Sequence, residues 1–273
     1  NLHSVMNTLY YPILKNDLPI DNLVEVAQEL SLDKNNDYRQ RLKAYALKNG
    51  LYEIADISGT SLSTQVIDTA QLEYDKLSSE LNPDIAYLQK EKPVIFVMDY
   101  AFGEQAFETM DELLKPFEYN GKRIPLNVES ISIMGKAGIL KGKKGDIMIP
   151  NGHVFEGTAD NYPFENDLKI EDFEKYDSVV ADGPMISVLG TSLQNRDILR
   201  YFVRSSWQVI GLEMEGAHYQ KAIQAASKIR KSIKENVTVR YAYYASDNPL
   251  VSGQTLASGS LGLVGVRPTY VIT

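Results

Sequence analysis

The stretch Val209-Ile-Gly-Leu-Glu213-Met-Glu215-Gly216 is an apolar run that stops at acidic residues. A second run, Val239-Arg-Tyr-Ala-Tyr-Tyr-Ala-Ser-Asp247-Asn-Pro-Leu250, stops at an acidic residue in the same way. Both patterns are typical of a buried strand whose end opens into a cleft. The segment between them, from Ala217 to about Lys234, has a helical pattern rich in Ala, Ile, Lys and Gln. A strand–helix–strand unit of this length predicts a parallel sheet with both acidic ends on the same edge.

The acidic ends of these two runs carry the groups that can break a bond between a sugar and a base. Cleavage of a ribosyl C–N bond requires that the cationic sugar be held and that the departing base be protonated or otherwise neutralised. One carboxylate can bind a sugar diol while another carboxyl group donates a proton. The pair of runs therefore predicts an enzyme that cleaves N-glycosidic bonds.

A third segment makes this prediction more specific. Ser130-Ile-Ser-Ile-Met-Gly135-Lys-Ala-Gly138 is followed by Ile-Leu-Lys-Gly-Lys-Lys-Gly145-Asp-Ile-Met-Ile-Pro150, which predicts a strand, a glycine turn, a short connection, Gly-Asp and a further strand. In this order, with Glu-Met-Glu and Ser-Asp after it, the chain resembles the nucleoside phosphorylase superfamily. The nearest pattern is that of methylthioadenosine/S-adenosylhomocysteine nucleosidase, and the resemblance covers Lys92 to Thr273. It implies a three-layer α/β/α sandwich around a mixed central sheet, and a homo-oligomer.

The resemblance also implies roles for the acidic residues. Asp247 matches the acid that protonates or hydrogen-bonds the base, and Ser246 would orient it. Glu215 matches the glutamate that binds the ribose hydroxyls, Met214 would pack beneath the sugar, and Glu213 would contribute through its backbone or side chain. Two structural alternatives stay open, since an Asp before Asn-Pro also forms turns and acidic residues also favour helix starts.

Glu104 is the residue that separates a hydrolase from a phosphorylase. It follows the predicted buried strand Val94–Met98 at the spacing of the nucleosidase's water-activating glutamate, although a glutamate in a first helical turn is often only a partner of the helix dipole. Phosphorylases place arginines in the loop after that strand and just before the glycine turn. The matching positions here are the loop from Asp99 to Gly103 and Ile133, which carry no arginine. Water is therefore the expected nucleophile.

Two departures from the nucleosidase pattern leave the substrate open. The glycine turn carries Lys136, beside Ala137 and Gly138, where the nucleosidase has Ser; a lysine there could bind phosphate or point to solvent. The base-stacking Phe is absent, and Leu193 and Gln194 stand in that region. Gln194 with Arg196 is similar to the Gln-x-Arg by which uridine phosphorylases bind uracil. The base is therefore undecided between purine and pyrimidine.

Composition limits the other classes of function. The chain has 273 residues, 44% hydrophobic and 23% charged, with a net charge of -8. This acidity disfavours nucleic acid and anionic membrane partners. There are no cysteines and only three histidines, so we expect no metal site and no cofactor. No run approaches the roughly 20 apolar residues of a membrane span. We expect a cytoplasmic protein, although the start at Asn1 leaves open a preceding targeting segment.

The chain divides by pattern into two parts. Residues 1–90 predict a helical N-terminal extension, and residues 91–273 predict the nucleoside phosphorylase-like catalytic domain. The extension has predicted helices at 18–30, 38–50 and 61–81. The catalytic part has predicted strands at 94–98, 129–134, 146–150, 152–156, 178–181, 185–189 and 269–272, with helices at 103–114 and 196–204.

The leading hypothesis is thus a nucleosidase that cleaves the glycosidic bond of a purine nucleoside or nucleotide in purine salvage. The alternatives are a phosphate-dependent purine or uridine phosphorylase, and a non-catalytic relative similar to plant storage proteins. Retention of Glu215 and Asp247 disfavours the storage protein. The expected partner is a small nucleoside or nucleotide.

Overall fold

The computed structural model describes residues 2–18, 20, 22–158, 160–190, 195–251 and 261–273. The chain folds into two units, the first made of Asn1–Tyr100 with Gly262–Thr273 and the second of Ala101–Leu261. The sequence had suggested a boundary near residue 90. The structure instead assigns the strand before Tyr100 and the last helix to the first unit.

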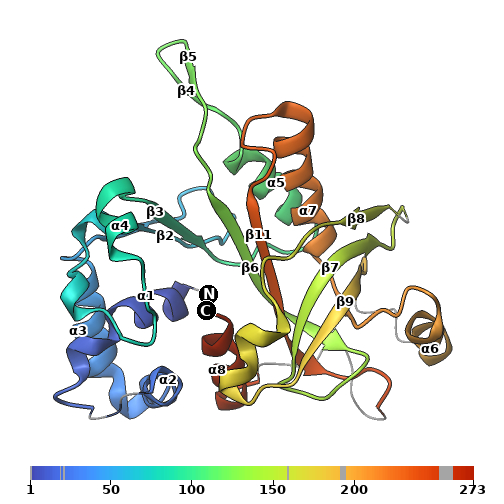
Figure 1. Ribbon diagram of the computed structural model, residues 1–273, viewed down its shortest axis with the longest axis horizontal. Coiled ribbons are helices and arrows are strands. Elements are labelled where there is room, and N and C mark those ends of the chain that lie inside the picture. Colours follow the sequence, from blue (N-terminus) through green and yellow to red (C-terminus); the bar gives the residue numbers. More distant parts are fainter. Residues whose placement is uncertain (1, 19, 21, 159, 191–194, 252–260) are drawn as a thin grey trace. The chain divides into compact units, whose positions relative to one another are not determined.

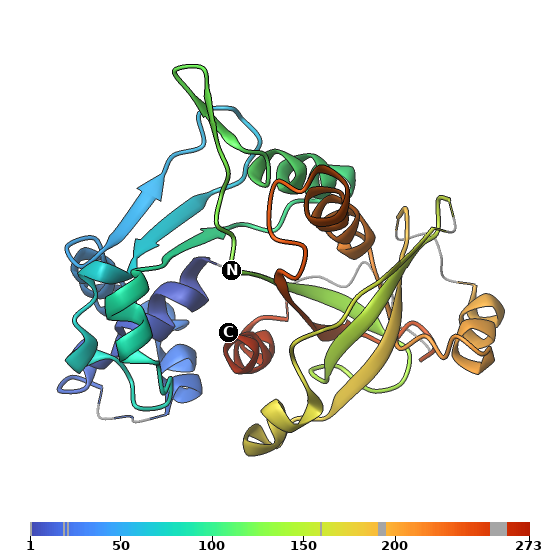
Figure 2. The same cartoon turned by 45° about the horizontal axis from the view of Figure 1, so that its top comes forward.

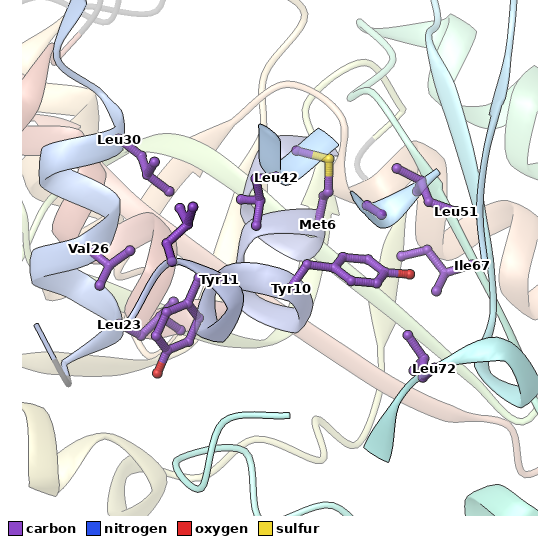
Figure 3. Packing of buried hydrophobic residues seen from close by; sticks show 12 residues of the cluster. Met6, Tyr10, Tyr11, Leu23, Val26, Leu30, Leu42, Leu51, Ile67 and Leu72 are labelled. Atoms are coloured by element: carbon purple, nitrogen blue, oxygen red, sulfur yellow. The ribbon is translucent and has the colours of Figure 1, made fainter. Parts of the chain in front are cut away.

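The first unit has a helical core. Helices α1 (Leu2–Tyr10), α2 (Leu23–Leu30), α3 (Asn36–Ala46) and α8 (Leu263–Ile272) contribute to it. Helix α2 begins where the side chain of Asn22 accepts hydrogen bonds from the backbone N–H groups of Val24 and Glu25. Its apolar residues repeat at helical spacing, so one face is buried. Figure 3 shows the cluster that results, which contains Met6, Tyr10, Tyr11, Leu14, Leu23, Val26, Leu30, Leu42, Ala46, Leu51, Ile67 and Leu72.

The first unit also has a sheet that the sequence did not predict in full. Strands β1 (Leu51–Ile54), β2 (Thr64–Asp68) and β3 (Val94–Met98) form an antiparallel sheet in the order β1-β2-β3. The predicted helix at 61–81 is wrong, because this segment forms β2 and two short 3-10 turns. The stretch Thr-Gln-Val-Ile-Asp alternates between more and less buried positions and is rich in β-branched residues, which favour a strand. Helix α4 (Ile85–Glu91) precedes β3.

Two predictions at the edges of the catalytic part need correction. Strand β3 has the predicted bounds but is not buried, since Val94 and Phe96 are 60% and 46% exposed. The predicted strand at 269–272 is helical and lies in α8. Tyr270 there packs against the helical core, and the hydroxyl of Thr269 donates to the carbonyl of Gly265 one turn earlier. Packing thus overrides the β propensity of these residues.

The second unit is built around a mixed sheet of six strands, which confirms the predicted mixed central sheet. The order is β11-β6-β10-β9-β7-β8, and a further pairing of β11 with β7 closes five of the strands into a ring (Figure 1). The three-layer arrangement stays a prediction. The strands are β6 (Ser130–Ile139), β7 (Ile147–Phe155), β8 (Asn161–Pro163), β9 (Val180–Ser187), β10 (Gly211–Glu213) and β11 (Thr238–Asp247).

The strands that carry the acidic residues run in opposite directions. Strand β11 is parallel to β6, whereas β10 is antiparallel to it, so the predicted parallel strand–helix–strand unit is wrong. Nevertheless, Leu212 of β10 and Asp247 of β11 both pair with Gly138 of β6, one on each side. The acidic ends therefore still converge on one point of the sheet. The predicted glycine turn at 135–138 is also wrong, because these residues continue strand β6.

Helices of the second unit follow the prediction more closely. Helix α5 (Glu104–Leu113) lies within one residue of its predicted bounds at each end, and α6 (Arg196–Arg204) has the predicted bounds. Helix α7 (Gly216–Gln224) continues as a π-helical turn to Arg230. It packs against α5, as Figure 1 and Figure 2 show. A hairpin of β4 (Phe117–Tyr119) and β5 (Lys122–Ile124) extends after α5. Within the described residues, every helix is too short or too polar to cross a membrane.

Candidate active site

Asp247 lies at the end of β11 and is buried. The hydroxyl of Ser246 lies 2.5 Å from Oδ1 of Asp247 and 3.2 Å from the carbonyl oxygen of Ala137. The shorter distance is that of a hydroxyl–carboxylate hydrogen bond, which is the stronger kind. This contact is what an orienting serine would make, and the catalytic role of the pair stays a prediction.

Glu213 is a buried carboxyl group with three hydrogen-bond donors around it. It accepts from the hydroxyl of Ser187, from the backbone N–H of Glu215 at 2.6 Å and from that of Gly216. The Ser187 oxygen in turn accepts from the N–H of Ala217 at 2.8 Å. Burial raises the pKa of Glu213 to about 7, and these donors oppose the rise. Glu213 therefore satisfies the first N–H groups of α7 and holds the start of that helix in place.

Glu215 is a further buried carboxyl group, and it points toward the start of another helix. Its Oε1 accepts a hydrogen bond of 3.1 Å from the backbone N–H of Gly103, the residue before Glu104. Burial raises the pKa of Glu215, and the Gly103 N–H opposes this. The contact joins the Glu-Met-Glu segment to the beginning of α5.

A pocket of about 350 Å³ lies beside this contact. Two of the residues predicted for the site, Glu104 and Met214, line it. Phe107, Phe155 and Tyr162 supply aromatic surface. The remaining lining residues are Gly103, Thr158, Val188, Leu189, Ala217, His218 and Lys221.

The pocket contains two ionisable residues that the sequence analysis did not assign, His218 and Lys221. The ring of His218 meets Phe155 edge to face at 4.9 Å. Burial lowers the pKa of His218, Glu104 raises it and Lys221 lowers it. The ammonium of Lys221 lies 5.1 Å from the centre of the Phe107 ring. A signal was present in the sequence, because Met214, Ala217, His218 and Lys221 recur at the spacing of one helical face.

Other predicted site residues lie outside this pocket lining. Four of them are buried and do not line it: Asp247, Ser246, Glu213 and Glu215. Lys136 is exposed in the middle of β6, whereas its neighbours in the predicted turn, Ala137 and Gly138, are buried. Leu193 and Gln194 lie outside the described residues.

The described residues contain no group of three His, Cys, Asp or Glu side chains that could hold a metal ion. The described lining of the pocket supplies the carboxylate of Glu104, the imidazole of His218, the ammonium of Lys221 and aromatic rings.

The fold is similar to that of nucleosidases. A candidate methylthioadenosine nucleosidase from Weissella paramesenteroides aligns with a TM-score of 0.51 and 13% identity, over 84% of this chain and 91% of that one. Futalosine hydrolase of Helicobacter pylori strain 26695 aligns with a TM-score of 0.50 and 14% identity, over 84% and 90%. These similarities confirm the predicted resemblance at the level of the fold.

By sequence, the chain belongs to a family of unknown function, DUF6909, which matches residues 21–273. No curated protein matches the chain.

Proposed function

We propose that the protein is an N-ribosyl hydrolase that cleaves the glycosidic bond of a purine nucleoside or nucleotide. The observation that carries this proposal is the hydrogen bond from Gly103 to Glu215, beside a pocket lined by Glu104 and Met214. It brings the candidate sugar-binding segment and the candidate water-activating residue to one place. The nucleosidase-like fold supports the same reading.

The proposed reaction uses three carboxyl groups. The oxygen of a water molecule forms a bond to C1′ of the ribose, and Glu104 accepts the proton that the water loses. The C1′–N bond breaks, its electron pair goes to the base, and Asp247 donates a proton to that base. Glu215 accepts hydrogen bonds from the ribose hydroxyls, and the apolar Met214 packs against the sugar.

The charges of the pocket favour water over phosphate as the nucleophile. Among the described lining residues there is no arginine, and Lys221 is the one permanent cation. Glu104 would repel a phosphate that approached its carboxylate, whereas it can accept a proton from water.

The proposal is tested by incubating the purified protein with adenosine, inosine, guanosine, uridine and the corresponding 5′-monophosphates. Release of free base is measured by chromatography in buffers with and without phosphate. We expect free base together with ribose or ribose 5-phosphate from at least one purine compound in the phosphate-free buffer. Glu215→Gln should reduce this release, and Glu174→Gln, a change at an exposed glutamate outside the pocket lining, should leave it unchanged.

Two results would contradict the proposal. Release that occurs only with phosphate, with ribose 1-phosphate as product, would make the protein a phosphorylase. Failure to release a base from every compound in both buffers would favour the non-catalytic alternative.

A further inference from the structure

Lys221 lies on the face of α7 that forms the pocket wall, one turn beyond Ala217 and His218. Among the described residues, no carboxylate lies within ion-pairing distance of its ammonium, whose neighbour is the ring of Phe107 at 5.1 Å. A cation over an aromatic ring at this distance is attracted by the ring face. The stem of Lys221 is thereby held along the wall, and its charge stays available to a ligand.

Glu104 gives the same pocket a negative charge at the start of α5. Among the described ion pairs none joins Glu104 to Lys221, although both charges act on the imidazole of His218: Glu104 raises its pKa and Lys221 lowers it. The two charges therefore lie near one imidazole without neutralising each other. A ligand that fills the pocket meets a carboxylate and an ammonium at separate places.

The first turns of α7 separate the candidate sugar-binding segment, which precedes the helix, from Lys221 by about the size of a small ligand. Helix α7 begins at Gly216, two residues after Met214, and the helix from Gly216 to Lys221 rises about 7.5 Å. Side chains on a helix lean toward its N-terminus, so we expect the ammonium of Lys221 to lie on the Met214 side of its own Cα. A pocket of about 350 Å³ is at the small end of ligand sites, large enough for one nucleoside-sized molecule.

We propose that Lys221 binds an anionic oxygen group, a phosphate or a carboxylate, and that the substrate itself carries this group on the side of the ribose away from the base. Lys221 is thus a specificity-determining residue that selects acidic nucleosides, such as nucleotides, over neutral ones. The assignment of the sugar to Met214 and Glu215 rests on the proposed function, whereas the anion site rests on Lys221 and its surroundings.

The test compares the binding of adenosine, adenosine 5′-monophosphate and inorganic phosphate by calorimetry. All proteins carry Asp247→Asn, so that cleavage does not consume the probe. Lys221→Met is compared with Lys228→Met, which removes an exposed lysine seven residues further along the same helical segment, outside the pocket lining.

We expect the parent protein to bind the monophosphate roughly tenfold more tightly than adenosine, as for a hydrogen-bonded charge pair that water partly screens. Lys221→Met should abolish this preference without weakening adenosine binding, and Lys228→Met should keep it. Circular dichroism checks that each variant is folded, and Lys221→Arg, which keeps the charge, should keep the preference.

The outcomes separate the anion site from the proposed reaction. A Lys221-dependent preference without base release from any compound would support the site and contradict the hydrolase. Base release without such a preference, or a preference that survives Lys221→Met, would overturn the inference and leave the hydrolase. If inorganic phosphate binds through Lys221 as tightly as the monophosphate does, the anion belongs to a second reactant and not to the substrate. That result would overturn the inference.

Discussion

The backbone N–H of Gly103 donates a 3.1 Å hydrogen bond to Oε1 of Glu215, which joins the start of α5 to the start of α7. Because Glu215 is buried, its carboxylate has exchanged water for this donor, and the loss of either partner leaves a polar group to be satisfied. The contact fixes Glu215 and Glu104 on neighbouring helices. Both should matter to function, through different steps.

Replacing Glu215 tests the sugar contact. Glu215→Gln keeps an oxygen for the Gly103 N–H but loses the negative charge, so we expect a folded protein whose kcat/KM for base release falls roughly 100-fold. Glu215→Ala leaves Gly103 without its acceptor and should also lower the free energy of unfolding by about 1–3 kcal/mol. Rates and urea unfolding curves are measured on both. Unchanged activity in a destabilised Gln variant would show that Glu215 has only a structural role.

Replacing Asp247 tests the acid. Asp247→Asn retains an oxygen that can accept from the Ser246 hydroxyl but cannot give a proton to the base. Turnover should fall roughly 10²–10⁴-fold while substrate affinity changes little. A substrate whose leaving group needs no proton, such as p-nitrophenyl riboside, should lose much less activity in the variant. Equal losses for both kinds of substrate would remove Asp247 from proton transfer.

Replacing Glu104 tests the nucleophile. Glu104→Gln should lower kcat of the phosphate-free reaction roughly 10²–10⁴-fold, because the amide cannot accept the proton of water. Binding of adenosine should persist, since the exposed Glu104 side chain has no structural hydrogen bond among the described contacts. The matched control is Glu108→Gln, one turn further along α5 and outside the pocket lining. Equal effects of the two changes would contradict a special role for Glu104.

Glu213 should make stability depend on pH. Burial raises its pKa from 4.5 to about 7, so the folded protein keeps a proton that the unfolded chain has released. Between about pH 4.5 and 7 the unfolded state binds fewer protons, and this group's contribution to the free energy of unfolding falls as pH rises. Over that window the loss should be roughly 2–4 kcal/mol.

The variant Glu213→Gln isolates this effect. It mimics the protonated carboxyl group, which can still accept from the N–H groups of α7, and it does not titrate. Urea unfolding of both proteins from pH 4 to 8 should show the wild type losing stability relative to the variant as pH rises. Burial also lowers the pKa of His153 to about 3, but that term is common to both proteins and cancels. A constant difference would contradict the prediction.

Gly216 should not tolerate a side chain. A Cβ there would lie 2.4 Å from the ring of His153 and 2.8 Å from the hydroxyl of Tyr243. Since His153 is fully buried and its ring stacks on Phe164, it has little room to move. Gly216→Ala should lower the free energy of unfolding by about 1–3 kcal/mol. Gly190→Ala, whose Cβ would meet nothing within 4 Å, is the control and should be nearly neutral.

Local signals explain which elements the sequence predicted well. Helix α6 has its predicted bounds, and a local signal marks its start: the side chain of Asn195 accepts from the N–H groups of Asp197 and Ile198. The failures at 61–81 and 269–272 come from segments whose structure depends on distant partners. Strand β2 exists because β1 and β3 flank it, and α8 because it packs against a core formed mostly by the first hundred residues.

The candidate site likewise has features that local sequence signals predict and features that depend on distant partners. The acidic strand ends could be found because a run of apolar residues that stops at Glu or Asp is visible locally. The opposite directions of β10 and β11 could not be found, because they follow from how both strands pair with β6. His218 and Lys221 were missed although their spacing was visible. Only the position of α5 shows that their face of α7 borders a pocket.

Helix α8 belongs to the first unit, although the whole second unit precedes it in the sequence. Asn7 donates a 2.7 Å hydrogen bond to the hydroxyl of Tyr270, and the hydroxyl of Thr273 donates to that of Ser4 at 2.9 Å. The first unit is thus interrupted by residues 101–261, which is an insertion of roughly 160 residues. At about 5–20 residues per second, a ribosome needs roughly 10–30 s to translate it. During that time the early helices lack α8, and the apolar surface it covers is open to chaperones and to other nascent chains.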